Sequence, residues 1–135
     1  MQQKQLGKWE LRELEGFCRQ YDDKRRQAAD ILLQVRSGTP HGSGGRGTPQ
    51  ESEVERKVSQ RERLLRDIRQ IEECARGIEG GRWYKALIQN ICRGIGYTYL
   101  DKVDLPTSCR NSYFQARKAF FLRLWWEREG IVPGA

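Results

Sequence analysis

Two long stretches of the sequence, residues 6–36 and 52–78, each carry one narrow stripe of apolar residues on an otherwise charged segment. The stripe of the first stretch recurs every seven residues, at Leu14, Tyr21, Ala28 and Val35. The stripe of the second stretch comprises Val54, Val58, Leu65, Ile68, Ala75 and Ile78. A helix with such a stripe can bury only one side. We therefore expect two long helices that pair as an antiparallel hairpin, a coiled-coil-like arm that forms a domain over residues 1–78.

Residues 37–50, which join the two stretches, contain five glycines and two prolines. This composition predicts a flexible loop. A glycine-rich phosphate-binding loop would need a Gly-Lys-Ser/Thr sequence after it, and none is present. The only histidine, His41, lies in this loop, and the four cysteines form no Cys-x-x-Cys pair. We therefore expect no metal site, and reduced cysteines that act as small apolar residues.

The composition changes after Gly80 and Gly81, which are expected to end the second helix because glycine readily takes a left-handed backbone conformation. Ten of the thirteen aromatic residues lie between Trp83 and Trp126. This concentration predicts a compact helical domain over residues 82–128. Its expected helices cover residues 83–93, 97–103 and 109–126, with a turn at Asp104-Leu105-Pro106. No segment alternates apolar and polar residues as a strand would, so the predicted fold class is all-α.

The last two of these helices, with the turn between them, have the pattern of a DNA-binding helix-turn-helix. Residues 79–135 carry nine basic and five acidic residues, and no acid lies between Asp104 and Glu127. A net positive region of this kind favours contact with phosphates. The predicted buried face of the last helix comprises Cys109, Tyr113, Ala116, Phe120 and Leu124. The side chains predicted to pair with base edges are Arg110, Asn111 and Gln115. The predicted helix cap is Thr107 or Ser108, and the predicted phosphate contacts are Thr107, Ser108, Arg117 and Lys118.

An enzyme is not expected from this sequence. A single histidine in a loop cannot complete a Ser/His/Asp or Cys/His set, and the aromatic region lacks an acidic cluster for two-metal chemistry. No cofactor is predicted. The chain has no run of about 18 to 20 apolar residues, and its start lacks the apolar core of a signal peptide. We therefore expect a cytoplasmic protein with no membrane partner.

Three segments carry a resemblance to a known family: residues 53–58, residues 91–100, and the run Leu105-Pro106-Thr107-Ser108-Cys109-Arg110-Asn111 with its continuation to Phe121. They resemble the small regulators encoded by prophages of Gram-positive bacteria, related to the RinA and ArpU late-gene activators. The C-terminal part of these regulators is similar to the promoter-reading fourth region of sigma factors. The resemblance implies sequence-specific binding to double-stranded DNA and control of phage late or packaging genes. It also implies that the recognition helix starts at Ser108, Arg110 and Asn111, followed by a basic tail at Arg117 and Lys118. A direct contact with RNA polymerase stays open.

Two alternatives stay open beside this interpretation. An ordinary helical bundle with a basic surface has the same pattern of helices and turns. Small terminase subunits, which package phage DNA as rings, also combine a helix-turn-helix with a coiled-coil arm. The stripes of residues 14–35 and 54–78 can pair within one chain or between chains, and pairing between chains would give a homo-oligomer. A ring of about eight or more subunits in solution favours packaging, whereas a monomer or dimer favours regulation.

Overall fold

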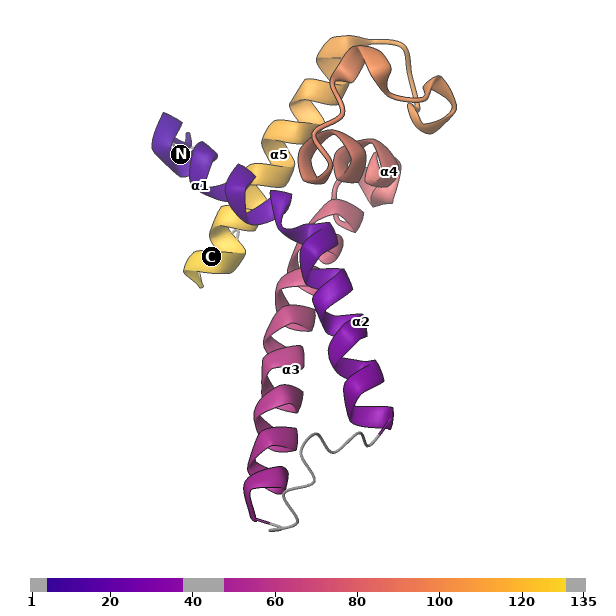
Figure 1. The fold of residues 1–135 in the computed structure, drawn as a ribbon. Helices are drawn as coiled ribbons and strands as arrows, with labels where there is room; N and C mark the ends of the chain where they lie inside the picture. Colours follow the sequence, from indigo (N-terminus) through magenta and orange to yellow (C-terminus); the bar gives the residue numbers. More distant parts are fainter. Residues whose placement is uncertain (1–4, 38–47, 131–135) are drawn as a thin grey trace. The chain divides into compact units, whose positions relative to one another are not determined.

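The computed structural model of the 135-residue chain describes residues 5–37 and 48–130. The regular elements in these ranges are all helical, which confirms the all-α fold class. The α-helices are α1 (Lys8–Arg19), α2 (Tyr21–Ser37), α3 (Thr48–Arg76), α4 (Tyr84–Leu87) and α5 (Arg110–Glu129), as Figure 1 shows. Shorter turns between α3 and α5 are the 3₁₀ turns η2 (Glu79–Gly81), η4 (Tyr97–Tyr99) and η5 (Lys102–Asp104), and the π-helical turn η3 (Ile88–Cys92). Most of the predicted loop over residues 37–50, with His41, lies outside the described residues.

The chain divides into two compact units, and the division differs from the predicted one between residues 78 and 82. One unit comprises Met1–Tyr21 and Arg69–Ala135, and we term its described part the head. The other comprises Asp22–Ile68, and we term its described part the arm. Helix α1 therefore belongs to the head and not to the arm. Within the described ranges, no helix combines the length and the apolar character that a membrane crossing requires.

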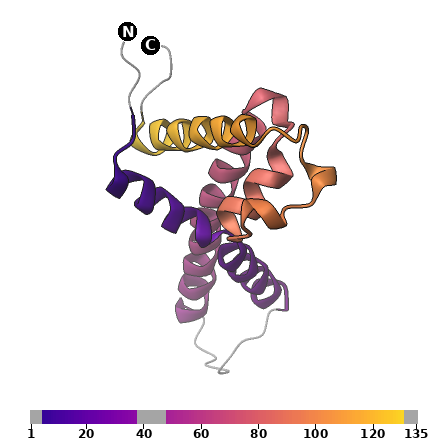
Figure 2. The same ribbon diagram turned by 90° about the horizontal axis from the view of Figure 1, so that it is seen from above.

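The predicted helix over residues 6–36 is interrupted at Gln20, which separates α1 from α2. Gln20 has φ −84° and ψ 0°, and its N–H donates to the carbonyl oxygen of Phe17 at 3.3 Å. Helix α1 contacts η3 and α5, and its buried side chains are Leu14, Phe17 and Cys18. Figure 2 shows the indigo ribbon of α1 beside the yellow ribbon of α5. Arg19 fixes this packing because its Nε donates to the carbonyl oxygen of Ile91 at 2.9 Å. The face that was expected to pair along the arm is therefore used by the head.

The arm is an antiparallel hairpin made by the arm segments of α2 and α3, as predicted. Its buried side chains include Ala28, Ile31 and Ile68. Polar contacts join the two helices: Lys24 Nζ to Asp67 Oδ2 at 2.8 Å, Arg61 Nε to the Ala28 carbonyl oxygen at 3.0 Å, and Lys57 Nζ to Gln34 Oε1 at 2.9 Å. The numbering of these pairs runs in opposite directions along the two helices, which fixes the antiparallel register.

Helix α3 ends at Arg76, before the position predicted from the two glycines. Gly80 and Gly81 have φ of 69° and 86°, so they do adopt the left-handed conformation, but they form the turn η2 that follows the helix. A close approach occurs earlier, at Gly77, where an added Cβ would require the Arg123 guanidinium to shift. Helix α3 therefore ends beside Arg123 of α5, and the turn at Gly80 and Gly81 then changes the direction of the chain.

The core of the head is aromatic. Its largest fully buried side chains include Trp83, Tyr113, Phe120 and Phe121. The predicted buried face of α5 is confirmed at Tyr113, Ala116, Phe120 and Leu124. It is wrong at Cys109, which is exposed because it precedes the first turn of α5 instead of lying within the helix.

Candidate nucleic-acid interface

The start of α5 differs from the predicted one. The helix begins at Arg110, and Cys109 occupies the N-cap position with φ −75° and ψ 109°. Neither Thr107 nor Ser108 caps the helix, so this prediction is wrong. Thr107 Oγ1 instead accepts a hydrogen bond from the Cys109 N–H at 3.2 Å, which turns the chain one step before the helix.

Helix α5 has two chemically different faces over its first half. Tyr113 and Ala116 are buried, whereas the amides, two of the three cations and the apolar Phe114 and Ala119 are exposed. The exposed polar and charged side chains are Arg110, Asn111, Gln115 and Lys118. Asn111, Gln115 and Lys118 are four and three residues apart, so they lie along one line of the helix. None of these three side chains makes a hydrogen bond or an ion pair within the described parts of the chain. This face is therefore free to contact a partner.

Arg110 is held in place by rings and not by an acid. Its guanidinium lies 5.2 Å from the ring centre of Tyr97 and 5.1 Å from that of Phe114. Cation–π contacts of this kind position the group while they leave the N–H groups at its edge available. Arg110 is thus ordered at the helix start and retains its hydrogen-bonding capacity for an anion or a guanine edge.

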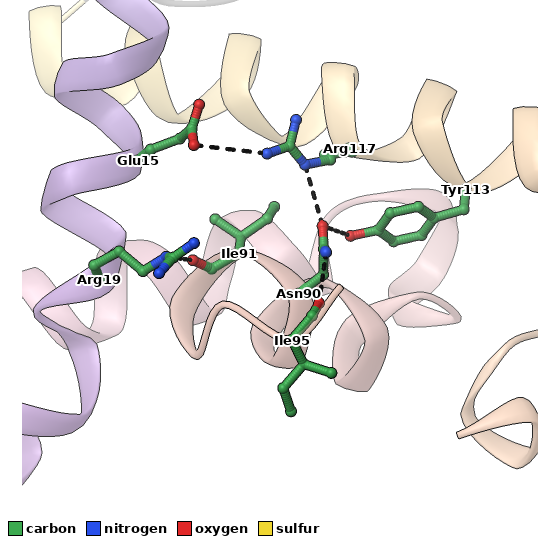
Figure 3. A network of polar contacts seen from close by, with 7 residues as sticks. All are labelled: Glu15, Arg19, Asn90, Ile91, Ile95, Tyr113 and Arg117. Carbon is green, nitrogen blue, oxygen red and sulfur yellow. Dashed lines mark hydrogen bonds and ion pairs between the residues drawn. The ribbon is translucent and has the colours of Figure 1, made fainter. Parts of the chain in front are cut away.

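Arg117, predicted to contact phosphate, belongs to a polar network inside the head (Figure 3). Its Nε donates to Asn90 Oδ1 at 3.2 Å, and its Nη2 lies 3.9 Å from Glu15 Oε2. Its guanidinium also lies 4.9 Å from the ring centre of Phe121. The side chain is half-buried in these contacts. The Arg117 side chain is thus bound within the head, and we leave it out of the candidate interface.

Asn90 is the centre of this network. Its Oδ1 also accepts a hydrogen bond from the Tyr113 hydroxyl at 2.6 Å, and its Nδ2 donates to the carbonyl oxygen of Ile95 at 2.8 Å (Figure 3). Burial raises the pKa of Tyr113, so this hydroxyl stays a neutral donor. Asn90 therefore ties α5 to η3 and to the chain that leaves η3.

The segment before α5 is irregular where a helix was predicted over residues 97–103. It forms two 3₁₀ turns, η4 and η5, separated by extended backbone at Leu100 and Asp101. The Asp101 carboxylate accepts a hydrogen bond from the Val103 N–H at 3.0 Å, which starts a new turn. Leu105 is extended again because Pro106 follows it. The first helix of the predicted helix-turn-helix is therefore absent from the described residues. The preceding helix, predicted over residues 83–93, is itself divided into α4 and η3.

This irregular segment, residues 96–109, is termed the loop. It displays two apolar side chains to solvent, because Tyr99 is 83% exposed and Val103 is 87% exposed. Lys102 lies between them in the sequence and is exposed as well. Of these three residue types, tyrosine is enriched at contact surfaces. The sequence analysis did not select these three residues because it placed them in a short helix. The signal that could have identified them is the succession of aromatic, basic and β-branched residues at this point of the sequence.

The two acids of the loop each have a partner. Asp101 accepts the Val103 N–H, and Asp104 Oδ1 lies 3.9 Å from Lys85 Nζ. Lys102, Arg110 and Lys118 form no ion pair with any residue that the structure describes. Three cations are thus available at the loop and the start of α5, which favours an anionic partner.

Cys109 is the exposed cysteine of the described chain, and it lies at this surface. Its pKa is lowered from the usual value, first by the hydrogen bond with the Ser112 side chain and then by the backbone N–H groups of Ser112 and Asn111. The other three cysteines are buried. Burial raises the pKa of Cys74 to about 12, and the pKa of Cys18 is raised by a hydrogen bond with Cys92 and by burial. The reactive thiol of the described chain is therefore Cys109.

Comparison of the chain with protein-family models, with curated proteins and with solved structures gave no significant match.

Proposed function

We propose that the protein binds double-stranded DNA in a sequence-specific way through the loop and the exposed face of α5, and that it acts as a phage-type transcriptional regulator. The observation that carries this proposal is the set of unpartnered amides and cations on α5. Asn111, Gln115 and Lys118 are exposed along one line of the helix, and Arg110 is ordered beside them. A helix with such a face fits the major groove, where Asn and Gln pair with adenine and Arg pairs with guanine.

The residues of the proposed surface divide by position into those that contact base edges and those that contact phosphates. Arg110 and Asn111 lie in the first turn of α5, the part of a recognition helix that approaches base edges. Lys118 lies two turns further on, where a helix that leaves the groove passes the backbone. Lys102 and the hydroxyls of Thr107 and Ser108 lie before the helix and suit phosphates of the flanking strand. The proposed protein is a binding protein without catalytic activity, so purified protein with magnesium should leave plasmid DNA intact.

The experiment that tests the proposal is selection of bound sequences from random duplexes by the full chain. Affinity for a selected duplex and for a scrambled one is then measured with Asn111→Ala and with a matched control, Gln27→Ala, which removes an exposed amide from the arm. We expect Asn111→Ala to lose about 1–3 kcal/mol on the selected duplex and much less on the scrambled one. Gln27→Ala should bind both as the parent does. Enrichment of no sequence, or equal effects of the two variants, would refute the proposal.

A second candidate, a small terminase-like packaging or assembly protein, is supported by apolar side chains that the arm leaves exposed. Leu33 is 67% exposed, and Val54 and Val58 are about half exposed. A homo-oligomer formed through the arm would cover side chains of this kind. The mass of the protein in solution separates the candidates, because a large ring supports packaging and a monomer or dimer supports regulation with RNA polymerase as a further partner.

A further inference from the structure

A pocket lies between the loop and the start of α5. These two segments are drawn in orange in Figure 1. Its volume is about 520 Å³, which falls within the roughly 300–1,000 Å³ of small-molecule sites. A pocket of this size exceeds what one backbone phosphate would fill. The proposed reading of duplex DNA therefore does not account for it.

The lining of the pocket combines apolar and polar residues. The apolar and aromatic lining residues are Leu100, Leu105, Pro106 and Tyr97. The polar lining comprises the hydroxyls of Thr98, Thr107 and Ser108 and the cations of Lys102 and Arg110. A ligand that suits this lining combines a flat apolar group with an anion.

The two cations are available to such an anion. Lys102 makes no ion pair with any described residue, and the Arg110 guanidinium lies against the Tyr97 ring without an acid. A guanidinium held by its flat face keeps its edge N–H groups for an oxyanion. The two carboxylates of the loop, Asp101 and Asp104, do not line the pocket. The electrostatics of the lining therefore favour a negatively charged ligand.

We propose that this pocket binds a nucleotide, with the phosphate at Lys102, Arg110 and the hydroxyls and the base against Leu100, Leu105 and Pro106. Bases are flat and stack on aromatic or apolar side chains, and phosphates bind Arg, Lys and hydroxyl groups. The nucleotide comes from one of two sources: free in solution, or unpaired within a nucleic-acid strand. The pocket shares Arg110, Lys102, Thr107 and Ser108 with the proposed duplex surface, but the inference does not depend on base reading by Asn111 and Gln115.

The first experiment is calorimetric titration of the full chain with adenosine 5′-monophosphate, adenosine and inorganic phosphate. We expect saturable binding of the monophosphate, at least about tenfold tighter than either fragment, because adenosine lacks the anion and phosphate lacks the flat apolar group that the lining suits. Lys102→Ala should weaken this binding by about five- to tenfold, since it removes a charged hydrogen-bond donor. Arg63→Ala removes one exposed positive charge from the arm and serves as the matched control, with no change expected.

The second experiment compares the affinity for a fully paired duplex with the affinity for the same duplex carrying one unpaired adenosine. In one outcome the monophosphate fails to bind while the chain still prefers the duplex with the unpaired adenosine. If Lys102→Ala removes this preference and Arg63→Ala retains it, the proposal is supported, and the source of the nucleotide is the strand. If neither the monophosphate nor the unpaired adenosine is bound in a way that depends on Lys102, the proposal is overturned. Asn111→Ala keeps the outcomes separate: it should weaken the paired duplex and leave the monophosphate unaffected, so either proposal can fail alone.

Discussion

Replacing Asn90 tests whether the polar network of Figure 3 holds α5 in place. Its side chain makes three hydrogen bonds, to the Tyr113 hydroxyl at 2.6 Å, to Arg117 Nε at 3.2 Å and to the Ile95 carbonyl oxygen at 2.8 Å. Asn90→Ala removes all three. It also leaves the hydroxyl of a fully buried tyrosine without its acceptor.

The magnitude follows from these contacts. Each hydrogen bond contributes about 0.5–1.5 kcal/mol net, and a stranded buried polar group costs about 1–3 kcal/mol. We therefore expect Asn90→Ala to lower the free energy of unfolding by about 2–4 kcal/mol. Tyr113→Phe removes one bond and leaves Asn90 paired with Arg117, so it should cost only about 1 kcal/mol.

The assay is thermal unfolding followed by circular dichroism, with Gln89→Ala as the control that truncates the neighbouring amide. At about 4 °C per kcal/mol, Asn90→Ala should lower Tm by roughly 8–16 °C. In the Asn90→Ala background, Tyr113→Phe should no longer destabilise, because it removes the stranded hydroxyl. If Asn90→Ala unfolds like Gln89→Ala, or if the two substitutions are additive, the network does not hold the helix.

Arg117→Ala should lower Tm and leave the salt dependence of duplex binding unchanged, whereas Lys118→Ala should weaken selected and scrambled duplexes equally and reduce the salt slope by about one. The opposite pattern would return Arg117 to the interface. Arg110→Ala should lose about 1–3 kcal/mol on the selected duplex and much less on the scrambled one, measured by fluorescence anisotropy. Iodoacetamide at neutral pH should modify Cys109 first in the native protein, because its lowered pKa gives more thiolate; mass spectrometry of modified peptides checks this. Ser112→Ala should raise the pKa of Cys109 and slow that reaction, so an unchanged rate would contradict the assigned cause.

The fold class and the pairing of the arm could be predicted because both follow from local periodicity. An apolar stripe specifies a helix with one buried side, and Ala28 of the first stripe and Ile68 of the second are buried, although Val54 and Val58 of the second stripe are exposed. The break at Gln20 could not be predicted, because no glycine or proline marks it. Its cause is non-local: Arg19 bonds to Ile91, and the face of α1 is buried by elements distant in sequence.

The candidate interface could also be predicted only in part. Once Tyr113, Ala116 and Phe120 are assigned to the core, helical spacing places Asn111 and Lys118 outside. Arg117 was assigned to phosphate contact because sequence gives the type of a side chain but not its partners. Those partners, Asn90 and Glu15, come from other elements. The loop was missed for a related reason: one carboxylate, that of Asp101, starts a new turn where composition alone predicts a continuous helix.

The network inside the head and the exposed face of α5 are physically linked. Successive helical residues are separated by about 100° around the axis, so anchoring two positions one turn apart fixes the rotation of the whole helix. Tyr113 and Arg117 are such a pair, and both bond to Asn90 Oδ1. While they are held, Asn111 and Lys118 must face solvent. Loss of the Asn90 anchor would leave the exposed residues intact but free their rotation, and a surface that must match base edges depends on that rotation. An Asn90 variant that stays folded should therefore lose more affinity for the selected duplex than for a scrambled one, although Asn90 itself is half-buried behind the helix.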